Sequence, residues 1–263
     1  MDRSSTDSPR IEFNRTKILG ALILFAVLIT LITRSDSRTV ETLVTDIGET
    51  SSITLADGSV VTLNTNTAVR ISHESQVLHF ELLRGEVLFS MSENPYPHLL
   101  VSAADVSIGE ARTTFAARRV DSGDVLVTVE SGTVFLASAQ VPPTLLVKND
   151  QVSVPGRDRS EALHTTHLAP QDVKDQLAWR TGELVFRHTT LAEAAHEFGR
   201  YNQHVKIEVL GAVAAVQVGG AFSAGDPLAF AQSVTFLNPE VRLQIDVQNP
   251  ERRILRLTQA TRD

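Results

Sequence analysis

The sequence predicts a mainly β chain with an α+β part, preceded by a single transmembrane helix. Three observations predict this class. They are an uncharged run near the N-terminus, a succession of strand-like segments with turn signals over residues 43–138, and mixed helix-like and strand-like patterns after residue 177. The 263 residues, 42% of them hydrophobic, are enough for more than one buried core.

Composition excludes several classes of function. The net charge is −7, with 31 acidic against 24 basic residues, so the chain should repel phosphate backbones and is not expected to bind nucleic acid directly. The chain has no cysteine, which excludes disulfides, thiolate catalysis and cysteine-based metal sites.

The first expected element is a transmembrane helix over residues 18–33, flanked by Arg15 and Lys17 on one side and Arg34 on the other. It would be about 24 Å long, a little short of a hydrocarbon core of about 30 Å, but the flanking basic side chains can reach outward to the interface. A cleaved signal peptide is the alternative, although no Ala-x-Ala-like site follows the run. Because more basic residues lie before the run than after it, residues 1–17 are expected to be a cytoplasmic tail. The bulk of the chain would then lie outside the inner membrane.

Residues 43–138 are predicted to form an all-β domain, a roll or a sandwich. The clearest hairpin is Ile53–Leu63, where apolar residues alternate along both arms and Asp57-Gly58 forms the tight turn. A second pair is expected between strands at 77–82 and 87–91, with Arg84-Gly85 at the turn. Further strands are expected at 99–102, 106–108, 125–129 and 134–136, the last two separated by a turn at Glu130–Thr133.

Residues 139–176 are interpreted as a connecting segment, because Pro142-Pro143 and Pro155-Gly156 interrupt a polar stretch. Beyond it, residues 177–258 predict a small domain with two helices and one sheet in the order β-α-β-β-α-β-β. One helix is expected at 190–202, behind a threonine cap, and another from Asp226-Pro227 to 237. The strands are expected at 184–186, 205–209, 216–222, 241–246 and 254–257.

Five short motifs in the β part follow one another as in a known family. They are Leu55-Ala-Asp-Gly-Ser59, Leu63-Asn64, Leu82-Leu-Arg-Gly-Glu-Val-Leu-Phe89, Pro97-His-Leu-Leu-Val101 and Val127-Thr-Val-Glu-Ser-Gly-Thr-Val134. In this order and spacing they resemble the FecR-type periplasmic domain of transmembrane regulators. The motif positions expected to have structural roles are Leu55, Asp57, Gly58, Ser59, Gly85, Glu86, Phe89, Phe115 and Gly132. One departure is Arg112-Thr-Thr-Phe115, where the family usually has Gly-Thr-x-Phe.

The later part resembles the C-terminal region of the same regulators, which has the secretin and TonB short N-terminal (STN) fold. The positions that carry this resemblance are Trp179, Arg200, Tyr201, Gly220 and Phe222, together with Asp226-Pro-Leu228. They too are expected to be structural. Trp179 is interpreted as a core side chain in preference to an interface anchor.

The resemblance implies a single-pass inner-membrane signal transducer. In the family, a TonB-dependent outer-membrane receptor loaded with its siderophore presents a signalling domain to the periplasmic region. The regulator then acts on an extracytoplasmic-function sigma factor in iron uptake. The implied partners are therefore that signalling domain, the membrane, and a sigma factor reached directly or through a separate protein.

Family members carry a sigma-binding domain before the membrane helix, whereas only Met1–Lys17 precede it here. Either the start of the chain lies further upstream, or the sigma-binding part is a separate polypeptide, or this output has been lost. A membrane-anchored periplasmic adaptor or scaffold without transcriptional output is the alternative function.

The chain is not expected to be an enzyme, and no cofactor or metal is expected. The chain contains no Gly-x-Ser-x-Gly, His-Glu-x-x-His, P-loop or Gly-x-Gly-x-x-Gly motif. His164 and His167 are interpreted as solvated histidines and not as metal ligands. Glu81 and Glu86 flank the expected turn and are interpreted as solvent-facing charges and not as an acid–base pair. Arg118-Arg119 is interpreted as two neighbours facing opposite sides of a strand and not as an anion site.

Overall fold

The structure, a computed structural model, describes residues 40–74, 77–92, 99–138, 143–156, 163–247 and 252–260. The chain divides into Met1–Thr39 and a compact unit, Val40–Asp263. The expected cytoplasmic tail and the expected membrane helix at 18–33 lie outside the described residues. Among the helices that the structure describes, none combines the length and apolar character needed to cross a membrane.

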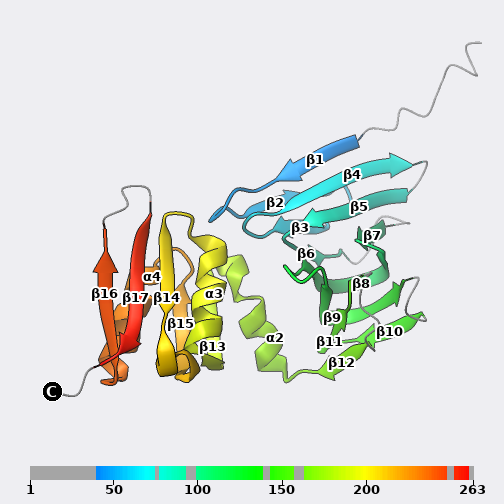
Figure 1. Ribbon diagram of the computed structural model, residues 1–263. Helices are drawn as coiled ribbons and strands as arrows, with labels where there is room; N and C mark the ends of the chain where they lie inside the picture. Colours follow the sequence, from blue (N-terminus) through cyan, green and yellow to red (C-terminus); the bar gives the residue numbers. More distant parts are fainter. Residues whose placement is uncertain are drawn as a thin grey trace, which may run out of the picture. The chain divides into compact units, whose positions relative to one another are not determined.

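Residues 40–167, called the β-rich part, form a 12-stranded sheet (Figure 1). The strands are β1 (Val40–Val44), β2 (Ser51–Thr54), β3 (Val60–Leu63), β4 (Ala68–Glu74), β5 (Val77–Arg84), β6 (Glu86–Ser90), β7 (Leu99–Ala103), β8 (Val106–Arg119), β9 (Val125–Ala137), β10 (Thr144–Val147), β11 (Asp150–Val154) and β12 (His164–His167). Eight of them follow the order β1-β4-β5-β7-β8-β6-β3-β2, while β9 pairs with β8, β10 and β11.

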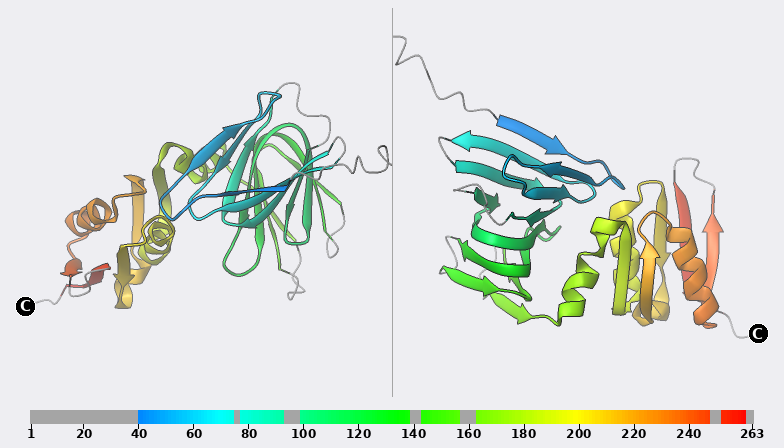
Figure 2. Two further views of the ribbon diagram at one scale, coloured as in Figure 1. Left: turned by 90° about the horizontal axis from the view of Figure 1, so that it is seen from above. Right: turned by 180° about the vertical axis from the view of Figure 1, so that it is seen from behind.

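The sheet curves around one apolar core to which strands β3 to β11 contribute (Figure 2). Phe80, Phe89 and Phe115 are fully or almost fully buried there. The rings of Phe80 and Phe89 meet edge to face at 5.4 Å, and those of Phe89 and Phe115 stack at 5.0 Å. The predicted all-β roll or sandwich is therefore present, with two of the motif phenylalanines at its centre.

The predicted pairing of the strands around Arg84-Gly85 is wrong. β5 pairs with β4 and β7, whereas β6 pairs with β3 and β8. Gly85 lies between β5 and β6 with φ of 84°. The chain bends there and enters a different region of the sheet, because a single residue with positive φ redirects the strand without folding it back on itself.

The expected turn at Glu130–Thr133 lies instead inside the single strand β9. Gly132 has φ of 76° and falls where the register opposite β8 shifts, between Ala111 and Thr114. The motif is thus an irregularity within a long strand, where glycine adopts the positive φ without the clash that a Cβ would cause.

The stretch interpreted as a connecting segment extends the sheet. β10 and β11 pair with β9, and β12 pairs with β11. Leu146 and Val152 are fully buried in the core. Pro143 directly precedes β10 and Pro155 directly follows β11, so neither interrupts a strand, while Pro142 lies outside the described residues.

Residues 170–259, called the C-terminal part, follow the predicted order of helices and strands from β13 onward. The elements are α2 (Pro170–Gln176), η1 (Ala178–Thr181), β13 (Glu183–Thr190), α3 (Leu191–Tyr201), β14 (Val205–Val209), η2 (Gly211–Ala215), β15 (Gln217–Ser223), α4 (Pro227–Leu237), β16 (Val241–Asp246) and β17 (Arg253–Gln259). The strands form two sheets, β13-β15 and β14-β17-β16, where the sequence predicted one. β17 is the central strand of the second, parallel to β14 and antiparallel to β16, and its Leu255 and Leu257 are fully buried.

Helix α3 begins with a capping box. The Thr190 side chain accepts a hydrogen bond from the Glu193 backbone, and the Glu193 carboxylate accepts one from the Thr190 backbone at 2.9 Å. These bonds satisfy two backbone N–H groups at the start of the helix, which have no partner within the helix itself. On the opposite face, Phe198 packs against Phe186 and Phe230, which fixes the helix against β13 and α4.

Thr190→Ala is expected to lower the free energy of unfolding by about 1 kcal/mol, the usual cost of losing a threonine cap. The comparison should be made by urea unfolding against Thr181→Ala, whose hydroxyl bonds only to the Ala178 carbonyl in a short 3-10 turn. Equal losses in the two variants would contradict a capping role for Thr190.

Candidate functional site: the Glu86 junction

Glu86, the first residue of β6, is buried, with 6% of its surface exposed. The expectation that it faces solvent is therefore wrong. Glu81, on β5, is the contrasting case: its side chain is 38% exposed and forms an ion pair with Arg70. The two carboxylates differ because β5 and β6 are not hairpin neighbours, so Glu86 faces the C-terminal part while Glu81 stays on the surface.

Three side chains donate hydrogen bonds to the Glu86 carboxylate. The indole Nε1 of Trp179 lies 3.0 Å from Oε1, and a guanidinium nitrogen of Arg200 lies 3.0 Å from Oε2. Asn64 Nδ2 also reaches Oε2 at 3.0 Å and lies 2.8 Å from the Tyr201 hydroxyl. We call these five residues the Glu86 junction. Glu86 and Asn64 belong to the β-rich part and the other three to the C-terminal part, so the junction joins the two.

Hydrogen bonds from neighbouring residues hold Asn64, in the loop before β4, in place. The side-chain oxygen of Asn64 accepts a hydrogen bond from the Thr65 backbone at 2.7 Å, and the Thr45 hydroxyl donates to the Asn64 backbone carbonyl at 2.6 Å. Thr65 then donates to the Arg200 carbonyl at 3.1 Å, and accepts from the Gly48 backbone at 2.7 Å. Because Thr45, Asn64 and Thr65 are buried and paired, the loop holds the end of α3 in a defined position.

The charges at the junction alternate. Arg200 forms ion pairs with Glu86 and with Glu197, and Glu197 also lies 3.3 Å from a guanidinium nitrogen of Arg118. Burial lowers the pKa of Arg200, but the neighbouring Glu197 and Glu86 carboxylates outweigh it and raise the pKa above its usual value. Arg200 therefore stays charged, and two carboxylates balance two guanidiniums.

Three protein donors hold the Glu86 carboxylate and only 6% of the residue is exposed, so external molecules have little access to it. Within the residues described, no group of three or more histidine, aspartate or glutamate side chains is placed to hold a metal ion. His164 and His167 are exposed on β12, where His167 contacts Asp150. The geometry of the junction thus suits mechanical coupling between two parts of a protein.

Comparison with known proteins places the β-rich part in a family. A model of the FecR protein family matches residues 41–135. Residues 41–135 are a FecR domain. The resemblance predicted from the sequence motifs is thereby confirmed.

Solved structures resemble more of the chain than the FecR domain. Two crystal structures of a putative anti-sigma factor from Parabacteroides distasonis are 21% and 20% identical to this chain, each with a TM-score of 0.64. The matches cover 85% and 84% of this chain and 100% of those chains. At this identity the likeness is one of fold, and it extends into the C-terminal part. No curated protein matches the chain.

Within the FecR domain, the other motif positions form a turn and part of the core. The Asp57 carboxylate accepts from the Ser59 backbone at 2.8 Å, and Gly58 has φ of 85°, which closes the predicted hairpin between β2 and β3. Leu55 packs at the edge of the core that holds Phe89 and Phe115.

In the C-terminal part, Gly220 has φ of 133°, and the Phe222 ring packs against Phe186 and Phe230. Trp179 is buried, with 3% exposed, and also donates to Glu86 of the FecR domain. The motif positions therefore divide into those that build each part and those that join them.

Sequence reasoning did not single out Glu197 or the partner role of Asn64. Glu197 lies one helical turn before Arg200, a spacing that indicates an ion pair on a helix. The second partner of Glu197, Arg118, is 79 residues away and gave no local signal. Arg118 and Arg119 have different partners, since Arg119 donates to the Leu83 carbonyl at 2.7 Å, but both line the same pocket and do not face opposite sides of the domain.

Tyr201 is expected to titrate above its usual pKa of about 10. Burial raises the pKa of the phenol, the Arg200 charge lowers it by less, and Glu86 and Glu197 raise it further. Tyr96→Phe leaves Tyr201 as the one tyrosine of the chain, so the absorbance of tyrosinate reports on it alone. Because the pKa of Tyr201 is higher in the folded than in the unfolded state, the neutral phenol contributes fully to the free energy of unfolding below about pH 10. This contribution is lost as the pH rises through the folded-state pKa. A midpoint at the usual value would contradict the burial of Tyr201.

Proposed function

We propose that this chain is a single-pass inner-membrane signal transducer of the FecR type. It receives a periplasmic signal from the signalling domain of a TonB-dependent receptor and regulates an extracytoplasmic-function sigma factor in siderophore-dependent iron uptake. The match of residues 41–135 to the FecR family carries the proposal. The similarity of fold to a putative anti-sigma factor supports it.

The proposal includes an order of parts along the chain. Residues 1–17 are the cytoplasmic tail, 18–33 the transmembrane helix, 43–138 the FecR-type domain and 177–258 an STN-like domain. No catalytic step is included, since signal transfer requires only binding and coupling.

The Glu86 junction supports a transmitting role. A partner that binds the C-terminal part and displaces α3 would move Arg200 and Tyr201, both of which contact Glu86 or Asn64. Because a buried ionic cluster tolerates little loosening, the displacement would be passed to β6 of the FecR domain. Such an arrangement converts binding at one part into a change at the other.

The test uses the full-length chain in its own membrane. Deleting its gene is expected to abolish the response of a sigma-dependent promoter to the inducing siderophore, and restoring the wild-type chain is expected to recover it. The tagged full-length chain, purified in detergent, should bind the receptor's signalling domain with a Kd of about 1 μM or tighter.

The role of the junction is tested with the Glu86→Gln variant. This variant should still bind the receptor's signalling domain but lose the promoter response. A promoter response that is unchanged by gene deletion would overturn the regulatory function. Absence of binding to every TonB-dependent signalling domain of the organism would overturn the receptor assignment and favour the adaptor function.

A further inference from the structure

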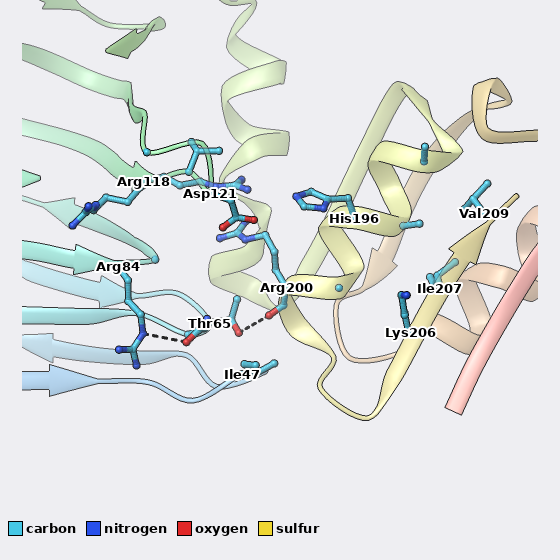
Figure 3. Close-up of a pocket in the computed structure, with 18 of the residues that line it drawn as sticks. Ile47, Thr65, Arg84, Arg118, Asp121, His196, Arg200, Lys206, Ile207 and Val209 are labelled. Atoms are coloured by element: carbon cyan, nitrogen blue, oxygen red, sulfur yellow. Dashed lines mark hydrogen bonds between the residues drawn. The ribbon is translucent and has the colours of Figure 1, made fainter. Parts of the chain in front are cut away.

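A groove of about 790 Å³ lies beside the Glu86 junction, between the FecR domain and the C-terminal part. Figure 3 shows Arg84, Thr65 and Arg118 on one side, and His196 and Arg200 of α3 with Lys206 of β14 on the other. Its size is within the range of ligand-binding sites in proteins.

The groove is strongly basic although the chain as a whole is acidic. Of its lining residues, six are arginine or lysine and a single one, Asp121, is acidic. The six are Arg84, Arg118, Arg119, Arg200, Lys206 and Arg252. In a chain of net charge −7, such a concentration of positive charge marks a surface that attracts anions.

Three of these charges are already neutralised by carboxylates outside the lining. Arg118 pairs with Glu197, Arg200 pairs with Glu86 and Glu197, and Lys206 Nζ lies 2.9 Å from Glu208. These cations therefore contribute little net field and mainly shape the wall.

The remaining three form no ion pair with any residue that the structure describes. Arg84 Nε donates to the Asn66 amide oxygen at 3.2 Å, and Arg119 donates to the Leu83 carbonyl, so both are oriented by neutral acceptors. Arg252, immediately before β17, is exposed. A guanidinium that donates to a neutral oxygen keeps its full positive charge and further N–H groups, both of which can bind a carboxylate ligand.

We propose that this groove binds an acidic, extended segment of a partner protein. The unpaired guanidiniums come from the ends of β5 and β8 and from the residue before β17, so the ligand must present several carboxylates along its length and not at one point. Ile47, Ile207 and Val209 also line the groove, which provides apolar contact between the charged positions. A peptide with alternating acidic and apolar residues meets both requirements. The inference goes beyond the proposed function, because it requires neither a receptor nor a sigma factor.

The probe is fluorescein-labelled hexaglutamate, titrated with the full-length chain in detergent and followed by fluorescence anisotropy. Wild-type chain is expected to bind the probe, with an affinity that falls as salt is added because the contacts are exposed ion pairs. The double variant Arg84→Gln/Arg252→Gln is expected to bind about tenfold more weakly. It leaves the Arg119 bond to Leu83 in place, and its melting temperature should equal that of the wild type.

The matched control is Arg242→Gln, which removes an exposed arginine of β16 that does not line the groove. It should bind within twofold of the wild type. Equal weakening by the control and the double variant would assign the binding to net charge and overturn the proposal. So would tight binding that the double variant leaves unchanged.

Two competitors distinguish the class of ligand. Monomeric glutamate at the same carboxylate concentration should fail to displace the probe, and displacement would indicate a site for small anions instead. Vesicles containing phosphatidylglycerol should bind wild-type chain and double variant equally. Vesicle binding that depends on Arg84 and Arg252 would replace the peptide by a lipid surface.

Discussion

Replacing Glu86 with glutamine is expected to lower the free energy of unfolding by about 3 kcal/mol, measured by urea unfolding. Removal of one partner from a buried ion pair leaves the other charge uncompensated, which costs about 3–5 kcal/mol. The lower end applies here because Arg200 keeps Glu197 as a second carboxylate. The glutamine NH2 group would also face another donor in either orientation, the Trp179 indole at the Oε1 position or the Asn64 amide and Arg200 at the Oε2 position.

Glu81→Gln is the matched control, since it removes a carboxylate from the neighbouring strand where the ion pair with Arg70 is exposed. Its expected cost is at most about 1 kcal/mol. Trp179 is the one tryptophan of the chain, so its fluorescence should shift in Glu86→Gln and stay unchanged in Glu81→Gln. Similar losses of stability in both variants would contradict the assignment of Glu86 as the centre of a buried junction.

Gly85→Ala is expected to lower the free energy of unfolding by about 4 kcal/mol. A left-handed conformation costs a residue with a Cβ about 1–2 kcal/mol, and φ is 84° at this position. The added methyl group would also collide with the Thr67 hydroxyl and lie 2.6 Å from Thr67 Cα and 2.8 Å from the Asn66 carbonyl. Relief of such overpacking requires the backbone to move, at a further cost of about 1–3 kcal/mol.

Gly58→Ala isolates the conformational part of that cost. Gly58 has almost the same φ, 85°, but a Cβ there would meet no atom within 4 Å. The expected loss is about 1–2 kcal/mol. If both variants lose the same amount, the close approach of the chain at Gly85 is not what requires glycine there.

Local signals in the sequence were sufficient wherever the determining contacts are local. The Asp57-Gly58 turn, the apolar face of α3 and the start of α4 at Asp226 were predicted correctly, because each depends on residues within one or two turns of chain. Gly85 shows the limit of such reasoning. A glycine between two strand-like segments predicts a hairpin, and no neighbouring residue indicates that the two strands pair with other strands instead.

The junction could not be predicted because its partners are distant in sequence. Glu86 is 22 residues from Asn64, 93 from Trp179 and 114 from Arg200. The motif resemblance identified four of the five residues as structural positions, but a motif does not say which positions meet. A charged residue beside a turn is normally solvated, and only the three donors supplied by other elements make burial of Glu86 favourable.

The position of β17 has a consequence for the order in which the protein can be completed. The ribosome makes this strand after every other described element, yet it is the central strand between β14 and β16. Until residues 253–259 emerge, those two strands lack a neighbour in their sheet, and the core that holds Phe198 of α3 lacks Leu255 and Leu257. The strands of the FecR domain precede residue 140 and have no such dependence. Arg200 and Tyr201 therefore reach stable positions beside Glu86 only after residues 253–259 have been made, so a closed junction reports that β17 is in place.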